Sequence, residues 1–172
     1  MRRELGDGYE LDDDRTRLDV DAIHAYLSEE SYWARGRPRE LVQLAIDGSA
    51  RVVGLYREGE QVGFARGVSD GATVAYLADV YVLAGHRGRG LGLELVREMI
   101  EGARDDGGVG ARVGASRSGR DVRWLLHTAD AQHLYAKLGF TSGPPQYPLM
   151  ERTRSGDRAS VRRGGRSAAR ER

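Results

Sequence analysis

Three glycines at alternate positions stand where a hydrophobic run ends and a helical pattern begins. The segment reads HRGRGLG and covers residues 86–92. Glycine loses more backbone entropy on folding than any other residue, so this composition indicates that something must approach the backbone closely. Successive backbone N–H groups and the positive end of the following helix can together bind an anion. We expect the turn to hold a pyrophosphate, and a glycine-rich turn that binds nothing is the competing interpretation.

Two better-defined phosphate motifs do not match this turn. A dinucleotide-binding fingerprint needs another glycine three residues after Gly90, where this chain has Leu93, and it also needs a parallel strand–helix–strand unit. A P-loop needs Gly-Lys-Ser/Thr, and the sequence contains no such tripeptide.

The composition is that of a soluble single domain. The chain has 172 residues, of which 40% are hydrophobic and 31% charged, and no apolar run approaches the roughly 18 residues of a membrane helix. Cysteine is absent, which removes disulfides, thiolate zinc sites and a cysteine nucleophile. We expect a cytoplasmic protein without a signal peptide. Four histidines without ligand spacing predict no metal site.

Positive charge is concentrated at the C-terminal end. Residues 151–172 contain eight arginines and three acidic residues. They contain almost no large apolar residue, so we expect one domain over 1–152 and a disordered extension over 153–172. An arginine-rich tail could bind nucleic acid, but this one has no aromatic residue to stack on bases, and we expect no such partner.

Periodicity predicts an alternation of strands and helices. Helices are expected over 18–30 with Asp19 as N-cap, from Pro38 to 46, over 91–103, and over 128–140 with Gly139 as C-cap. Strands are expected over 8–12, in a hairpin over 50–70, over 72–83, as a buried strand over 122–127, from Phe140, and over 147–151. Residues 104–121 are expected to form a loop.

Two segments resemble the GNAT superfamily of acyl-CoA-dependent N-acyltransferases. The segment DVYVLAGHRGRGLGLELV matches the family pattern Gln/Arg-x-x-Gly-x-Gly/Ala through Arg87, Gly90 and Gly92. The segment TADAQHLYAKLGF is similar to a later helix of the family, and the positions that match are Ala131, Leu134, Tyr135, Lys137, Leu138, Gly139 and Phe140. The likeness covers about residues 8–150 in the order that the family has them.

This resemblance implies an α/β (α+β) fold and a bound acetyl-CoA. The expected sheet is mixed and mostly antiparallel, with about six to seven strands, about four flanking helices, and splayed fourth and fifth strands that admit acetyl-CoA. We expect a bacterial-type member in which these residues contact acetyl-CoA: Val80, Tyr81, Val82, Arg87, Gly88, Arg89, Gly90, Leu91, Gly92, Thr128, Ala131 and Tyr135.

Acetyl transfer to an amine needs a base for the amine and an acid for the departing thiolate. By resemblance Tyr135 is the acid, although its helical periodicity alone favours a core tyrosine. Asp79 is the first candidate base, because it is the only charge in the apolar run 72–84. Strand alternation places it with Ala75, Leu77 and Tyr81, and a structural aspartate bonded to a loop is the alternative. His127 and His133 are further candidates for a proton relay.

The resemblance implies that the loop between the first two helices covers the acceptor site. Tyr32 and Trp33 would supply an apolar wall there, beside Asp79 and Tyr76, and Tyr76 should share a face with Val80. The acidic pair 29–30 could attract a cationic amine, and packing of the loop is an equal alternative.

The predicted function is transfer of the acetyl group of acetyl-CoA to a primary amine of a small molecule or peptide. The alternatives are a different acyl-CoA, an oxygen acceptor, or a non-catalytic acyl-CoA sensor, and a homodimer is left open.

Overall fold

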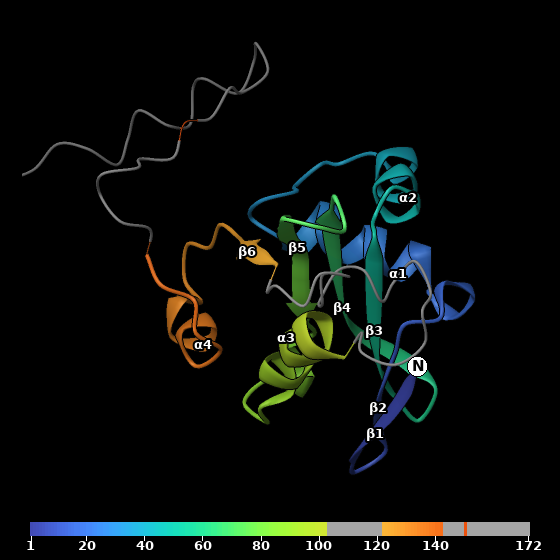
Figure 1. The fold of residues 1–172 in the computed structure, drawn as a ribbon. Coiled ribbons are helices and arrows are strands. Elements are labelled where there is room, and N and C mark those ends of the chain that lie inside the picture. The colour runs from blue at the N-terminus through green and yellow to red at the C-terminus, as the bar shows by residue number, and fades with distance from the viewer. Residues whose placement is uncertain (103–121, 143–149, 151–172) are drawn as a thin grey trace, which may run out of the picture. The chain divides into compact units, whose positions relative to one another are not determined.

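One six-stranded sheet organises the chain, as the computed structural model shows (Figure 1). The structure describes residues 1–102, 122–142 and 150. The strands lie in chain order, each antiparallel to the next except that β5 and β6 are parallel. The strands are β1 (Arg2–Gly6), β2 (Tyr9–Asp12), β3 (Arg51–Arg57), β4 (Glu60–Ser69), β5 (Val74–Val82) and β6 (Arg123–Leu125).

Four α-helices flank the sheet in the described ranges. They are α1 (Val20–Ala25), α2 (Arg39–Asp47), α3 (Leu91–Glu101) and α4 (Gln132–Ala136). A π-helical turn, Tyr26–Glu30, follows α1 directly. The predicted α/β class with a mixed, mostly antiparallel sheet is confirmed. The elements all fall in one compact unit, Met1–Phe140.

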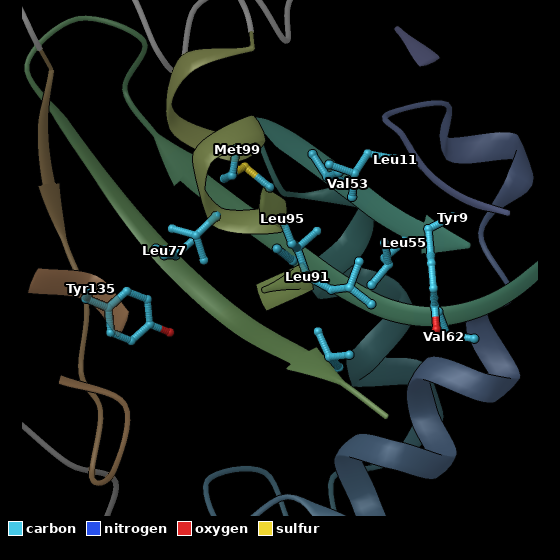
Figure 2. Packing of buried hydrophobic residues seen from close by; sticks show 13 residues of the cluster. Tyr9, Leu11, Val53, Leu55, Val62, Leu77, Leu91, Leu95, Met99 and Tyr135 are labelled. Carbon is cyan, nitrogen blue, oxygen red and sulfur yellow. The ribbon is translucent and has the colours of Figure 1, made fainter. Parts of the chain in front are cut away.

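The sheet separates two hydrophobic clusters. Leu91, Leu95 and Met99 of α3 recur every four residues and turn toward the sheet in Figure 2, as their spacing predicts. Tyr135 of α4 belongs to the same cluster. The second cluster joins α1 and α2 to the opposite face through Phe64 and other residues.

Local chemistry sets the start of α1 as predicted, whereas α4 ends at Ala136 with Lys137 as its C-cap, earlier than the predicted end at Gly139. The Asp19 carboxylate accepts from the N–H of Ala22, 2.9 Å away, and so caps α1. Pro38 immediately precedes α2. Gly139, with φ of +84°, ends the turn after α4, where the N–H of Phe140 bonds to the carbonyl of Tyr135.

One strand was not predicted, and several predicted segments differ from the structure or lie outside the described residues. Strand β1 was not predicted, because only Leu5 among its residues is apolar and large. The strand over 122–127 is neither as long nor as buried as predicted, since β6 pairs on one side only among the described residues and its Arg123 and Leu125 are exposed. No strand begins at Phe140 within residues 140–142. The predictions for 104–121, 153–172 and most of 147–151 lie outside the described residues.

Candidate active site

A β-bulge interrupts the pairing of β4 with β5. Phe64 pairs with Tyr81 and Arg66 pairs with Ala78, so two residues of β5 lie opposite one residue of β4. One of the two is Asp79, whose φ of +50° is left-handed. An extra residue reverses the alternation of side chains beyond it.

The bulge corrects the predicted faces of β5. Leu77 and Val80 both contact the cluster under α3, whereas Tyr81 belongs to the cluster under α1 and α2. Asp79 therefore shares a face with Tyr81, as predicted, but not with Leu77. The prediction that Tyr76 shares a face with Val80 is wrong for the same reason: Tyr76 precedes the bulge and Val80 follows it.

Three donors hold the Asp79 carboxylate. Trp33 Nε1 donates to Oδ1 at 3.0 Å, and Arg37 Nη1 and Arg66 Nε donate to Oδ2 at 2.8 and 2.6 Å. Burial of the side chain, which is only 4% exposed, would raise the pKa of Asp79, but the charges and hydrogen bonds of Arg66 and Arg37 outweigh it and lower that pKa. A carboxylate with a lowered pKa that already accepts three hydrogen bonds binds a proton weakly. The contacts therefore favour the alternative of a structural aspartate bonded to a loop.

The residues predicted for the acceptor side gather around the same loop. The rings of Tyr32 and Trp33 meet edge to face with centroids 4.9 Å apart. The Tyr32 hydroxyl accepts from the N–H of Ala129 at 2.9 Å, and the Tyr76 hydroxyl lies 2.7 Å from His127 Nδ1. The first bond joins the loop after the π-helical turn to the segment before α4, and the second joins that segment to β5.

The glycine turn combines backbone conformation with close packing. Gly88 and Gly90 both have φ of +78°, a region that side chains with a Cβ rarely adopt. Gly90 is the N-cap of α3. A Cβ at Gly92 would lie 3.2 Å from Leu134 Cδ1, so this glycine allows α4 to approach α3.

The N–H groups of residues 88–92 bond to no acceptor in the described part of the chain. Five consecutive donors thus lie at the positive end of an 11-residue helix. The side chain of Leu91 is buried in the core, so this residue can offer a ligand only its backbone.

Arg87 directs its guanidinium toward the protein. Its Nε donates to the carbonyl of Val82 at 2.7 Å, and its Nη2 donates to the hydroxyl of Tyr26 at 3.0 Å. Arg87, which matches the family pattern, therefore fixes the turn between β5 and α3.

Strands β5 and β6 pair over three residues only. They pair only at Val74–Arg123, Ala75–Trp124 and Tyr76–Leu125, whereas β5 continues to Val82. From residue 77 onward, the β6 side of β5 has no strand partner among the described residues.

Tyr135 of α4 lies next to this opening of the sheet. Figure 2 shows its ring extending from α4 toward β5, and Phe140 packs against it edge to face at 5.7 Å. Burial raises the pKa of Tyr135 to about 12, with further contributions from Tyr32, Asp130 and Tyr76. The hydroxyl is therefore protonated at neutral pH.

The segment before α4 is held by a local bond. Thr128 Oγ1 accepts from the N–H of Ala131 at 3.0 Å, so this hydroxyl already orders the start of the helix.

Arg37 and Arg66 are site residues that sequence reasoning missed. Neither lies in a motif, and arginine is frequent throughout the chain. Only the bulge, which no local pattern announces, brings Asp79 to them. Within the described ranges no group of three or more acidic or histidine side chains could hold a metal ion, and no helix is long and apolar enough to cross a membrane.

The comparisons with known proteins agree with this architecture. Residues 48–142 match the family model for the acetyltransferase (GNAT) domain, and the chain belongs to that family. A provisionally assigned acetyltransferase of Gibberella zeae is 35% identical over 116 residues, which are 55% of this chain and 65% of that protein. An uncharacterized N-acetyltransferase of Gracilaria tenuistipitata is 29% identical over 142 residues, covering 71% of this chain and 70% of the relative.

Solved structures give the same result. A provisionally assigned GNAT-family acetyltransferase from Xanthomonas campestris superposes with a TM-score of 0.71 and 40% identity, covering 88% of this chain and 97% of that one. N-acetylglutamate synthase from Neisseria gonorrhoeae, solved with coenzyme A and L-arginine, shares the fold alone. Its TM-score is 0.58 at 15% identity, over 83% of this chain and 29% of the synthase.

Proposed function

We propose that the protein is an N-acetyltransferase that moves the acetyl group of acetyl-CoA directly to a primary amine of a small molecule or peptide. The observation that carries the proposal is the row of unbonded N–H groups over residues 88–92 at the start of α3. Oriented N–H donors at a helix N-terminus suit a pyrophosphate. Acetyl-CoA would supply a thioester as the acyl donor.

The room around the turn supports this proposal. A Cβ added at Gly88 or at Gly90 would have no neighbouring atom within 4 Å, so the space beside the turn at these two residues is open. The backbone of Val80, Tyr81 and Val82 then offers the continuation of the site, along the edge of β5 that faces away from β4. Thr128 and Ala131, in the segment before α4, would border the same site.

In the proposed reaction the acceptor nitrogen loses a proton and forms a bond to the acyl carbon, and the C–S bond of the thioester breaks. Tyr135 would donate its proton to the departing sulfur. Because its pKa is raised, the hydroxyl carries its proton at neutral pH, which this role requires. Direct transfer is favoured because the chain contains no cysteine to carry the acyl group.

On the acceptor side, Asp79 would act as a positioning residue. It links Trp33 and Arg37 of the loop to Arg66 of β4, and so sets the wall against which an acceptor would lie. Tyr32 and Tyr76 would complete that wall. The proton of the amine would then leave through water or a neighbouring group such as His127, which is bonded to Tyr76.

Calorimetric titration with acetyl-CoA, CoA and a longer acyl-CoA tests the proposal, followed by thiol release with a panel of amines. We expect acetyl-CoA to bind and thiol release to depend on both the amine and the Tyr135 hydroxyl. Binding without thiol release for any amine or alcohol would support a sensor instead. Failure of every CoA species to bind the folded protein would contradict the proposal.

A further inference from the structure

The candidate acceptor side carries an excess of positive charge. Arg37 and Arg66 both donate to the same oxygen of Asp79, so two guanidinium groups share one carboxylate. Their side chains are only 24% and 14% exposed. A charge sheltered in this way is screened less than one in open water. The cluster therefore favours a further anion.

Both guanidinium groups keep donors that no described residue uses. Arg37 bonds to Asp79 through Nη1 and Arg66 through Nε, and their other nitrogens bond to no described residue. None of these nitrogens is among the buried atoms that lack a partner in the described part of the chain. A guanidinium binds a carboxylate through two parallel N–H donors.

These donors lie beside the residues proposed for the acceptor. Trp33 bonds to the other oxygen of the same Asp79 carboxylate, and its ring packs on that of Tyr32. Arg66 of β4 pairs with Ala78 of β5, and Val68 pairs with Tyr76 two residues further along each strand. Because paired residues and those two positions away lie on the same side of a sheet, Arg66 and Tyr76 point to one face. An acceptor lying against these aromatic rings would have the guanidinium groups within reach.

We propose that the acceptor is an amine that also bears a carboxylate, and that Arg37 and Arg66 bind this carboxylate. The inference rests on the proposed function and names the substrate class of the same site. The same positive charge lowers the pKa of an acceptor ammonium and so favours the neutral amine that attacks. The acidic residues 29–30 are exposed on the π-helical turn, where water screens their attraction for a purely cationic amine.

The test compares amino acids with their C-terminal amides, for example L-phenylalanine with L-phenylalaninamide, across a panel of side chains. Thiol release gives kcat/KM, and calorimetric titration of the CoA-bound protein gives acceptor binding without turnover. We expect the best acids to exceed their amides by about 10-fold or more in both measurements, the effect of one charged hydrogen-bonded pair.

Variants locate the effect. Arg37→Gln and Arg66→Gln should each lower the preference for the acid about 10-fold. Arg37→Lys and Arg66→Lys keep the charge, so these variants should fold and lose only part of that preference. Arg35→Gln is the matched control, because Arg35 is exposed in the same loop and bonds to none of these groups. Its preference should equal that of the unchanged protein.

Equal or weaker binding of every acid relative to its amide would overturn the inference, as would a preference that survives both glutamine variants. Thiol release from amines without such discrimination would leave the proposed function standing. Failure of acetyl-CoA to bind would instead remove the proposed function, and titration of acids and amides to the free protein would still decide the inference.

Discussion

Arg87 donates a hydrogen bond to the hydroxyl of Tyr26, 3.0 Å away, and thereby links the turn before α3 to the start of the π-helical turn after α1. The ring of Tyr26 stacks on that of Tyr81 of β5, with centroids 3.9 Å apart and planes within 11°. The proposed pyrophosphate turn and the loop that carries Trp33 are thus fixed to the same point of the sheet. A substitution at Tyr26 should therefore affect both the turn and the loop.

The first prediction concerns that bond. Tyr26→Phe keeps the stacked ring and removes the hydroxyl, so we expect a loss of about 1 kcal/mol in the free energy of unfolding and weaker acetyl-CoA binding, measured by urea denaturation and calorimetry. Tyr56→Phe is the control, because the buried Tyr56 hydroxyl has no partner in the described part of the chain. An equal effect of the two substitutions would contradict a specific role for Tyr26.

The second prediction separates two glycines near this turn. Gly90→Ala forces a side chain into φ of +78° and should destabilise the fold by about 1 kcal/mol. At Gly85 the φ is not positive and a Cβ would also meet nothing within 4 Å, so Gly85→Ala should change stability little. Urea denaturation of both variants measures the difference. If Gly85→Ala proves equally costly, the left-handed conformation at residue 90 is not what requires glycine.

The outline of the fold could be predicted from the sequence because local chemistry decides it. The stripe of Leu91, Leu95 and Met99 and the cap at Asp19 each depend on residues within a few positions of one another. The pairing of β4 with β5 depends instead on residues far apart in the chain, and one extra residue at Asp79 reversed the predicted faces beyond it.

The candidate site also contains residues that local sequence could predict and residues that it could not. The sequence placed Tyr135 and the glycine turn through contiguous motifs. It could not indicate that Arg37 and Arg66 meet at Asp79, because that contact joins three separate elements.

The third prediction follows from the lowered pKa of Asp79. Asp79→Asn leaves two guanidinium groups without their anion, so we expect a loss of about 2–4 kcal/mol at neutral pH. Because the folded-state pKa lies below the ordinary value of 3.8, the carboxylate stabilises the fold fully above that value. This contribution is lost as the pH falls through the lowered pKa.

The difference in unfolding free energy between the unchanged protein and Asp79→Asn should therefore be constant from about pH 8 to 5 and shrink in more acidic solution. Denaturant titrations at each pH measure it, with Asp47→Asn, at an exposed position of α2, as the control. A difference that grows toward acid would mean that the pKa is raised, and Asp79 would again be a candidate base.

The fourth prediction tests the acid. Tyr135→Phe removes the proton that would reach the departing sulfur, so we expect kcat for thiol release to fall about 100-fold. Acetyl-CoA affinity and stability should change little, since Tyr135 keeps its ring against Phe140. Calorimetry and thermal unfolding check both quantities.

The pH dependence gives an independent measure of the same group. With a pKa raised to about 12, Tyr135 stays protonated through pH 10, and its ionisation should cause no fall in kcat between pH 8 and 10. A fall there that disappears in Tyr135→Phe would mean that the hydroxyl ionises near pH 9. A kcat that Tyr135→Phe leaves unchanged would assign the acid to another group, and Tyr135 would be only a core residue of α4.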